Sequence, residues 1–296
     1  MNTMTQAVLE PRAPGAERAP VTRAPVSVVI PCYRCEKTIE EAVASIAAQT
    51  LPPAEILLVE DASGAETLAA LHRVAAAYGP DWIKVIALPA NGGPSMARNV
   101  GWEQAQQPYI ALLDADDTWA PRKLELQMAA LQADPSIALI AHQVPVRTRG
   151  TPAPEPRLPA EAQIVGRRTL LVRNPFPTSS VVLRRDLPYR FDVDYRRSED
   201  YLLWSQIVFS GYRCAKIEQP LAIANRREDG EVGLSDDFAA VHRGRSLLRR
   251  KLVREGLLTR REYVYASAAG MANKMRLQFL RRMRHLRRLA TSHAQA

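Results

Sequence analysis

Three aspartates, Asp114, Asp116 and Asp117, follow directly on an apolar segment at residues 110–113. Carboxylates this close repel one another unless a cation offsets their charge. Mg²⁺ and Mn²⁺ bind carboxylate oxygens and keep coordination positions open for phosphate oxygens. A metal held here would stabilise a departing diphosphate as a Lewis acid. The alternative is a solvated acidic loop that caps a helix starting near Pro121, and the cluster alone leaves both interpretations open.

Three further polar motifs each follow a strand-like apolar segment. They read PCY at 31–33, EDAS at 60–63 and NGGPSMARN at 91–99. In an open α/β sheet, ligands bind at the carboxyl ends of the strands. The four motifs are therefore expected to meet on one rim of a sheet, and their coincidence there is stronger evidence for a site than any one of them.

A fifth motif, RSEDY at 197–201, opens an apolar helix expected at 199–209. Acidic side chains are favoured in the first turn of a helix, because they face its positive end. A capping role for Glu199 and Asp200 is therefore the simplest interpretation of this motif alone. A catalytic role needs support from the other motifs.

The elements that must position these residues alternate along the chain. Apolar segments of strand length are separated by segments with helical periodicity, over short connections, and this pattern predicts an α/β fold with a mostly parallel sheet covered on both faces. The expected strands are 26–30, 56–59, 82–88, 109–113 and 137–141, and the expected helices are 36–49, 67–78, 94–107 and 121–133.

The second half of the chain is less regular. Five prolines within 145–159 predict an irregular exposed loop. Structure is expected to resume at 167–172, with a strand at 179–183, the helix at 199–209 and shorter strands near 212–217 and 221–224. Everything beyond 235 has a helical pattern.

Composition limits the cell compartment. The 296 residues are 47% hydrophobic, which is ample for a packed core. Three cysteines cannot form a disulfide framework, so a reducing compartment is expected. No segment approaches the roughly 20 apolar residues needed to span a bilayer. Residues 1–24 are rich in proline and lack an apolar stretch, which predicts a disordered leader and no signal peptide.

Basic charge is concentrated at the C-terminus. The net charge is +9, yet residues 243–296 hold 15 Lys+Arg and 2 Asp+Glu, and the remainder holds 25 and 29. This distribution argues against a nucleic-acid-binding surface along the whole chain. Residues 274–289 place a leucine or methionine at every third position among arginines, which predicts a basic amphipathic helix on an anionic membrane surface. The alternative is a helix that packs on the domain.

The motifs together resemble the family 2 glycosyltransferases of the GT-A fold. The resemblance rests on VSVVIPCYRCEKTIEEAVASIAAQT, EDAS, NGGPSMARNVG and ALLDADDTW followed by PRKL, and it covers roughly 25–235. It implies inverting transfer of a sugar from a nucleotide diphosphate-sugar, with UDP favoured, to a hydroxyl of a glycan or lipid-linked acceptor. It also implies Mn²⁺ or Mg²⁺ and surface polysaccharide or glycolipid assembly at the inner face of the cytoplasmic membrane.

The resemblance assigns the donor side residue by residue. Pro31 and Tyr33 match the segment that packs on the nucleotide base, and Asp61 matches the acid that hydrogen-bonds the base, usually uracil. Arg98 matches a basic residue near the sugar or diphosphate. These types suit the ligand, because a uracil N3–H needs an acceptor and a diphosphate needs donors and positive charge.

The metal and the proton acceptor are assigned in the same way. Asp114 and Asp116 match the DxD-type pair, with Asp116 as the direct metal ligand. Asp200 matches the general base that takes the proton of the acceptor hydroxyl, and Glu199 is the second candidate. One departure concerns the position where the family often carries Arg-x-His. Residues 226–228 read RRE here, so Arg226 is the phosphate-binding candidate and no histidine is available.

These assignments divide the chain into four parts. Residues 1–24 are the leader, 25–143 the nucleotide-sugar-binding part, 144–234 the acceptor-binding part and 235–296 the basic amphipathic helical tail. The rival to an enzyme is a non-catalytic nucleotide-binding or membrane-associated interaction protein on a transferase fold. A nucleotidyltransferase would carry a Gly-rich basic loop after its first strand, where PCYRC stands.

Three smaller features are best explained as structural residues without a catalytic or binding role. Cys32 and Cys35 form a CxxC that imitates a thioredoxin-type redox motif, but such a protein has no use for the acidic cluster. His142 fits a partly buried structural residue better than the lining of an acceptor pocket. Trp119 and Trp204 are typical of packing residues.

Overall fold

The computed structural model describes residues 22–148, 150–151, 155–226, 238–272 and 275–276. Its main sheet has eight strands in the order β3-β2-β1-β4-β9-β6-β10-β8. The strands are β1 (Ala24–Cys32), β2 (Pro53–Glu60), β3 (Ile83–Ala87), β4 (Tyr109–Leu112), β6 (Ile137–Gln143), β8 (Ala162–Ile164), β9 (Val182–Arg184) and β10 (Arg213–Pro220).

Most neighbouring strands of this sheet run parallel, as the sequence predicts. Strands β3, β2, β1 and β4 are parallel, and so are β6 and β10. Strand β9 enters between β4 and β6 in the opposite direction, and β8 adds an antiparallel edge on β10. The strand expected at 179–183 begins later than predicted, because Thr178–Ser180 form a 3-10 turn, η1, before β9.

A second sheet of three short strands lies beyond the acidic motif. Strand β11 (Ala222–Arg226) pairs antiparallel with β5 (Thr118–Trp119) and parallel with β7 (Val146–Thr148). The sequence did not predict β5, β7 or β8. The expectation of an irregular loop over 145–159 is wrong for β7, which gains its hydrogen bonds only from β11, a strand more than seventy residues away.

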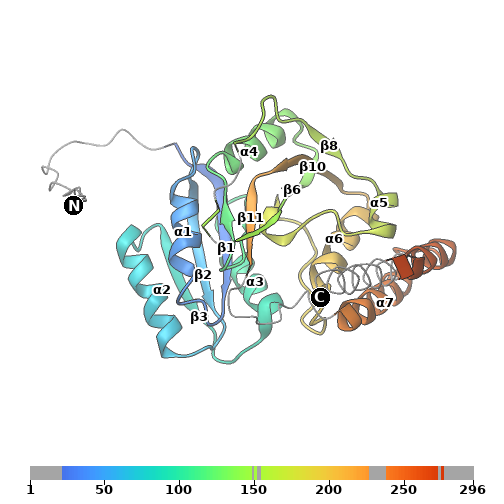
Figure 1. Ribbon diagram of the computed structural model, residues 1–296, viewed down its shortest axis with the longest axis horizontal. Helices are drawn as coiled ribbons and strands as arrows, with labels where there is room; N and C mark the ends of the chain where they lie inside the picture. The colour runs from blue at the N-terminus through green and yellow to red at the C-terminus, as the bar shows by residue number, and fades with distance from the viewer. Residues whose placement is uncertain (1–21, 149, 152–154, 227–237, 273–274, 277–296) are drawn as a thin grey trace, which may run out of the picture.

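Helices cover both faces of the main sheet, as Figure 1 shows. They are α1 (Ile39–Ala47), α2 (Ala65–Tyr78), α3 (Gly93–Gln104), α4 (Lys123–Ala133), α5 (Arg167–Val172), α6 (Glu199–Phe209) and α7 (Phe238–Arg254). Alternate residues of a strand point to opposite faces. Val28 of β1 accordingly packs in one core with α1, α2 and α4, whereas its neighbour Val29 packs in a second core with α3, α5, α6 and α7.

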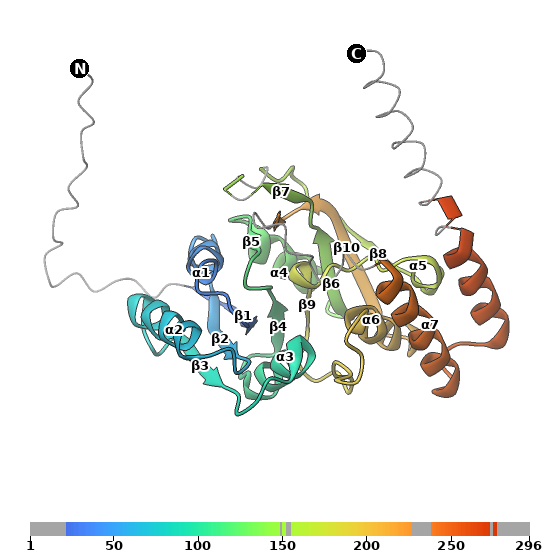
Figure 2. The ribbon, with the colours of Figure 1, turned by 60° about the horizontal axis from the view of Figure 1, so that its bottom comes forward.

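The first part of the predicted tail packs on the domain. After α7 the chain turns, and helical residues 260–272 run beside α7, as Figure 2 shows. Leu248, Leu252 and Leu258 are buried in the same core as α6. Residues 238–272 therefore pack on the domain. The amphipathic segment expected at 274–289 lies outside the described residues except for 275–276, which are helical.

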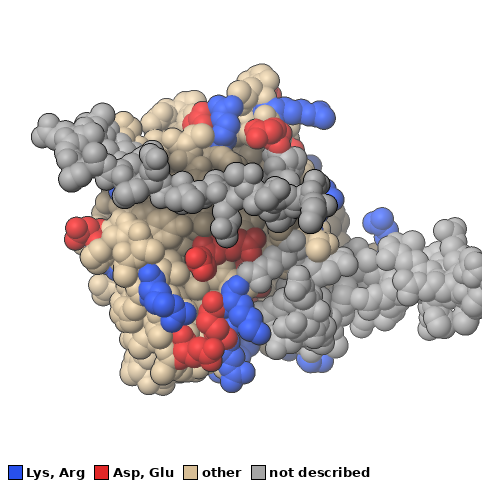
Figure 3. Space-filling model, turned by 60° about the vertical axis from the view of Figure 1, so that its left-hand side comes forward, with Lys and Arg blue, Asp and Glu red and all other residues tan. Residues whose placement is uncertain are grey.

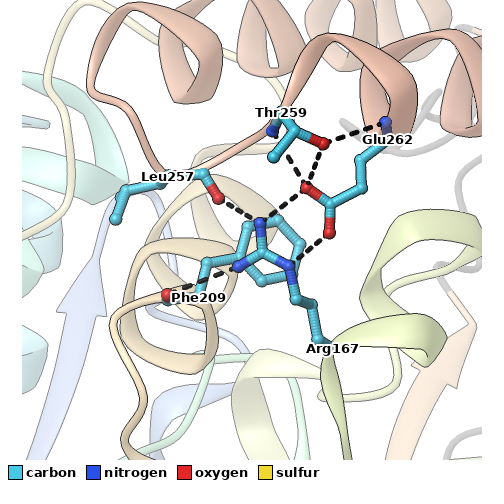
Figure 4. A network of polar contacts seen from close by, with 5 residues as sticks. All are labelled: Arg167, Phe209, Leu257, Thr259 and Glu262. Carbon is cyan, nitrogen blue, oxygen red and sulfur yellow. Dashed lines mark hydrogen bonds and ion pairs between the residues drawn. The ribbon is translucent and has the colours of Figure 1, made fainter.

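A polar network fastens these C-terminal helices to the domain (Figure 4). Arg167, at the start of α5, binds both carboxylate oxygens of Glu262 and donates to the carbonyl oxygens of Leu257 and Phe209. Thr259 also donates to Glu262, and these partners lower the pKa of Glu262 to about 2. The turn between the two helices is thus held by charge-assisted hydrogen bonds.

The N-terminal boundary of the domain is earlier than predicted. Ala24, the last residue of the expected leader, begins β1, and the Arg23 side chain donates to the Pro53 carbonyl oxygen. Residues 1–21 lie outside the described residues, so the expectation of disorder there is untested. Within the part of the chain that the structure describes, no helix has the length and apolarity to cross a membrane.

Candidate active site

The four donor-side motifs follow the carboxyl ends of β1, β2, β3 and β4, which lie side by side and parallel in the sheet. Pro31 lies in β1, and Tyr33 comes directly after this strand. Tyr33 is 48% exposed, and the Arg34 guanidinium lies 5.2 Å from its ring centre. An exposed aromatic ring at this rim is free to stack on a planar ligand. The predicted base-packing positions are therefore accessible.

Asp61, after β2, has a structural role that the sequence did not show. Its carboxylate oxygens accept hydrogen bonds from the backbone N–H groups of Gly92 at 2.7 Å and Gly93 at 2.8 Å. Its carbonyl oxygen accepts one from the Asn91 side chain. Asp61 thus holds the loop at the start of α3. Asp61 is 3% exposed and both its carboxylate oxygens are engaged here, so its predicted contact with a base stays a prediction.

The position of Arg98 follows from the close packing of α3 on the sheet. A Cβ at Gly101 would lie 2.4 Å from a methyl group of Val29 in β1, so only glycine allows this approach. Arg98 stands one helical turn earlier and is 5% exposed. A guanidinium that is buried so deeply needs paired anions, because its desolvation is costly.

Arg98 joins the two halves of the site. One guanidinium nitrogen donates to Asp114 Oδ1 at 2.7 Å, and another donates to Glu199 Oε1 at 3.4 Å. Its plane also lies over the Phe191 ring at 5.3 Å. Burial opposes the charge on Arg98, but Asp114 and Glu199 outweigh that effect and raise its pKa. Arg98 therefore reaches Glu199 across 101 positions of the chain and links it to Asp114.

In the first acidic pair, Asp114 and Asp117 have different partners. Asp114 is paired with Arg98 and is about a third exposed. Asp117 is buried and accepts a 2.5 Å hydrogen bond from the Ser179 hydroxyl. Burial and the neighbouring charge of Asp114 raise the pKa of Asp117 to about 8. The pair therefore combines one carboxylate that is paired with a cation and one whose pKa is raised by burial.

In the second acidic pair, Glu199 binds Arg98 and Asp200 does not. Asp200 Oδ2 accepts a 2.8 Å hydrogen bond from the Asn174 amide, and Oδ1 accepts one from the Tyr201 backbone. Burial, followed by the charge of Glu199, raises the pKa of Asp200 to about 6. A carboxylate with a pKa near 6 is a better proton acceptor at neutral pH than an ordinary aspartate.

The backbone before Asp200 is strained and is supported by α7. Ser198 has φ +60°, and the other two non-glycine residues with positive φ in the described chain, Arg34 and Ala62, also stand at the site motifs. Such conformations cost about 1–3 kcal/mol and persist where the surroundings impose them. Gly244 of α7 is part of those surroundings, because a Cβ there would lie 2.8 Å from the Arg197 carbonyl oxygen.

The predicted metal pair lies at the turn between β4 and β5. The Asp116 carbonyl oxygen accepts a hydrogen bond from the Asn225 amide of β11, which ties this turn to the second half of the chain. Within the described ranges there is no cluster of three or more acidic, histidine or cysteine side chains set to hold a metal. Two carboxylates nevertheless suit Mg²⁺ or Mn²⁺, which complete their coordination with water and substrate phosphates.

The phosphate-binding candidate on the acceptor side is only partly described. Arg226 ends β11 and stands opposite Thr148 of β7 in the strand register, but its side chain lies outside the described residues. Residues 227 and 228 lie outside the described residues altogether. Position 228 is where the family often carries a histidine and this chain has a glutamate. Their predicted relation to the diphosphate stays untested.

The CxxC has the environment of structural cysteines. Cys32 and Cys35 are both free thiols and both buried. Burial, with Cys35 and Glu60 nearby, raises the pKa of the Cys32 thiol well above its ordinary value. A reactive cysteine has the opposite property, a lowered pKa with access to solvent. The redox interpretation therefore finds no support in the geometry.

Sequence reasoning missed the neutral side chains behind the acids. Asn174, which binds Asp200, comes from the irregular stretch after α5, and Ser179, which binds Asp117, lies in η1, where the sequence predicted a strand and no polar role. It also missed a buried layer beneath the acidic turn. Lys123 lies 3.8 Å from the Trp119 ring centre, and its ammonium has no hydrogen-bond partner among the described residues, so burial lowers its pKa.

The three aromatic and histidine expectations agree with this packing. Trp119 and Trp204 are buried, and the Trp119 ring nitrogen donates to the Ser179 carbonyl oxygen at 2.8 Å. His142 is fully rather than partly buried, and its Nδ1 pairs with the Gln143 carbonyl oxygen. Desolvation lowers its pKa well below the ordinary value. None of the three is exposed to an acceptor.

Comparison with known proteins agrees with the site. The model of the family "Glycosyl transferase family 2" matches residues 27–195. The chain is 32% identical to the glycosyltransferase EpsE of Bacillus subtilis over 70% of this chain and 74% of EpsE. It is 30% identical to the succinoglycan biosynthesis protein ExoO of Rhizobium meliloti over 64% of this chain and 57% of ExoO.

Solved structures show the same fold. The crystal structure of residues 1–349 of S. aureus TarS, in complex with UDP-GlcNAc, matches with a TM-score of 0.61 and 23% identity, covering 77% of this chain and 66% of that one. The mannosyltransferase PcManGT from Pyrobaculum calidifontis, in complex with GDP-Man and Mn²⁺, matches with a TM-score of 0.55 and 22% identity. That match covers 79% of this chain and 66% of PcManGT.

Proposed function

Because the chain belongs to glycosyl transferase family 2, we propose that it moves a sugar from a nucleotide diphosphate-sugar to a hydroxyl acceptor with inversion of configuration. UDP-sugars are the favoured donors. The relatives ExoO and TarS carry names from polysaccharide synthesis and polymer glycosylation, and a surface polysaccharide or glycolipid is the acceptor class that we propose here.

The observation that carries this proposal is the bridge made by Arg98. It links Asp114, on the side of the nucleotide motifs, to Glu199, beside the candidate base. A transferase must hold donor and acceptor within reach of each other, because correct placement supplies much of the rate enhancement. In this chain a single buried cation fixes the relative position of the two acidic pairs that would contact them.

The residues of this chain then have separate tasks. Tyr33 and Asp61 would orient the base, and Arg98 would place positive charge beside the diphosphate. Asp200 would accept the proton of the acceptor hydroxyl. The hydroxyl oxygen of the acceptor would then bond to the sugar carbon while the bond between that carbon and the diphosphate breaks. The pKa of about 6 leaves Asp200 ionised and ready at neutral pH.

Asp114 and Asp116 would hold Mn²⁺ or Mg²⁺, which neutralises charge on a leaving diphosphate. Asp114 is already shared with Arg98, so cationic charge from the protein lies beside this position as well. Asp116 would then be the principal ligand.

The setting that we propose is the inner face of the cytoplasmic membrane, reached through the C-terminal region. The tail carries most of the excess positive charge, and each basic residue close to an anionic surface contributes on the order of 1 kcal/mol. The remaining surface is mixed, and the face in Figure 3 carries acidic and basic side chains next to each other.

Calorimetric titration of UDP, GDP and TDP, with Mn²⁺ and separately with EDTA, tests the proposal. We expect metal-dependent binding of one diphosphate that is lost in Asp116→Ala. Asp186→Ala is the matched control, because Asp186 is exposed and paired with Arg184 away from the site motifs. If no nucleotide binds under either condition, the transferase proposal fails and an interaction protein on this fold becomes the better account.

A further inference from the structure

A groove of about 510 Å³ opens on the C-terminal helices, away from the candidate active site. It is lined by Leu247, Arg250, Val253, Arg254, Arg260 and Tyr263. The first four belong to α7, and the last two belong to helical residues 260–272. Guanidinium groups and apolar side chains therefore share one concave surface, which is the composition expected of a site for an anionic amphiphile.

The arginines of this groove are exposed and have no carboxylate partner among the described residues. The two acidic residues of the helix pair have other partners: Glu255 accepts hydrogen bonds from Gln206, and Glu262 is bound by Arg167. Positive charge on the groove is therefore not neutralised from within the described chain. A guanidinium binds phosphate with two parallel hydrogen bonds, which makes arginine well suited to a phosphate group.

The same helices also expose an unusual share of the apolar side chains. Thirteen large hydrophobic residues are exposed in the described chain, and five of them lie on α7 and its neighbour: Leu247, Val264, Tyr265, Met271 and Met275. Of these five, Leu247 lines the groove, and the other four add exposed apolar side chains to the C-terminal helical region. Tyrosine in particular favours interfaces where one end of the ring is apolar and the other is wet.

The groove is fixed relative to the catalytic domain. The Arg167 network in Figure 4 holds the turn between the helices, and Lys251 pairs with Asp192. A surface held so firmly can set the orientation of the whole domain on whatever it binds.

We propose that this groove binds the phosphate headgroup and adjoining acyl region of an anionic phospholipid, and so docks the domain on a membrane. Arg250, Arg254 and Arg260 would contact the phosphate, and Leu247, Val253 and Tyr263 would contact the acyl region. The inference rests on the membrane setting of the proposed function and assigns it to a folded groove instead of to segment 274–289 alone.

Co-sedimentation of the full chain with phosphatidylglycerol–phosphatidylcholine vesicles, and with phosphatidylcholine vesicles alone, tests the groove. We expect binding to the anionic vesicles that falls about 100-fold in Arg250→Gln/Arg254→Gln/Arg260→Gln, given the contribution of each basic residue near such a surface. The matched control is Arg73→Gln/Arg147→Gln/Arg168→Gln, which removes the same charge from exposed arginines elsewhere and should lower binding only a few-fold.

A second variant, Leu247→Gln, probes the apolar part of the groove and should weaken vesicle binding about 3- to 10-fold. Unchanged circular dichroism and thermal unfolding would show that these exposed substitutions leave the fold intact. If the triple variant sediments like the unaltered chain, the groove is not the docking site. If the unaltered chain binds soluble glycerol phosphate in calorimetry but does not sediment with the anionic vesicles, the groove is a phosphate site and lipid docking is overturned.

The same samples separate this inference from the proposed function. Nucleoside diphosphate binding, measured by calorimetry, should be equal in the unaltered chain and the groove variants, because the groove lies outside the site motifs. Loss of vesicle binding with intact nucleotide binding supports the groove. Absence of nucleotide binding in every sample would reject the transferase proposal while leaving the vesicle result to decide the groove.

Discussion

The two acidic pairs of the site are built differently but end in the same arrangement. Asp114 and Asp117 follow a strand of the parallel sheet, whereas Glu199 and Asp200 open a helix. In each pair one carboxylate is bound by Arg98, and the other is bound by a neutral side chain, Ser179 or Asn174.

The difference within each pair is chemical. The carboxylates bound by Arg98 have their charge compensated, whereas burial raises the pKa of Asp117 to about 8 and that of Asp200 to about 6. One buried cation therefore pairs with one carboxylate of each pair and leaves the other with a raised pKa. The comparison teaches that burial and the charge of the neighbouring carboxylate decide which member of each pair holds a proton more tightly, whereas the neutral donors Ser179 and Asn174 act in the opposite direction.

The largest effect is expected from Asp200→Asn. Loss of a general base lowers the rate about 10²- to 10⁴-fold, measured as release of nucleoside diphosphate from the donor that titration identifies. Glu199→Gln is the control within the same pair and should cost less, because Glu199 is committed to Arg98. A greater loss in Glu199→Gln would reverse the assignment of the two acids.

Arg98→Met breaks the link between the pairs. It leaves Asp114 and Glu199 without their cation, and we expect the free energy of unfolding to fall by roughly 3 kcal/mol, at the lower end for a buried ion pair because Asp114 is partly exposed. Urea unfolding measures it. Arg184→Met removes an exposed pair with Asp186 and should cost less than about 1 kcal/mol. Equal losses in both variants would show that the ion pairs of Arg98 contribute no more to stability than an exposed surface pair.

Gly244→Ala should disturb the pair Glu199 and Asp200 and leave the pair Asp114 and Asp117 unaffected. The added methyl would press on the Arg197 carbonyl oxygen just before Glu199 and Asp200, at a cost of about 1–3 kcal/mol. We expect a lower transfer rate with unchanged nucleoside diphosphate affinity, because Asp114 and Asp117 lie on the far side of Arg98.

The control for this variant is Gly270→Ala. At Gly270 the nearest atom to an added Cβ is 3.4 Å away, on the flexible Arg249 side chain. Alanine should therefore be neutral or stabilise this helix by up to about 1 kcal/mol. Nucleotide affinity that falls in Gly244→Ala would show that the two pairs respond together.

The smallest effect concerns pH. Asp200 accepts a proton only when ionised, so the transfer rate should fall as pH drops through about 6. Asn174→Ala removes a donor that stabilises the charged form of Asp200, which should raise the pKa of Asp200. The acidic limb of the pH–rate profile, where the transfer rate falls, should then move to higher pH by about one unit. Ser179→Ala, which acts on Asp117, should leave the limb in place, and a shift in both variants would mean that the limb does not report Asp200.

The contribution of Asp200 to the free energy of unfolding should fall as pH rises, whereas the transfer rate should rise. The pKa of Asp200 is about 6 in the folded chain and about 3.9 for an unfolded aspartate. The folded state therefore binds more protons between these values, and the contribution of Asp200 to stability falls as pH rises from about 4 to 6. Urea unfolding across this range should show a shallower fall in Asp200→Asn than in the unaltered chain.

Much of the fold could be predicted from local patterns. The helix expected at 199–209 has the observed bounds, and the first four strands lie where apolar segments follow one another between helices. Strands β5, β7 and β8 could not be predicted, because each has only two or three residues and depends on hydrogen bonds to distant segments. Short strands carry too little side-chain pattern to be recognised without their partners.

What the sequence by itself determined was the set of acids and the rim on which they gather. The rim follows from local order, because side chains at the ends of parallel strands must share one edge, and Glu199 and Asp200 stand out through their own motif at the start of a helix. Only the tertiary structure decided how the acids are paired. Arg98 reaches Glu199 across 101 positions, and neither Asn174 nor Ser179 carries a local signal for the acid that it binds. Proton affinity depends on burial and on partners a few ångströms away, and those exist only after the chain has folded.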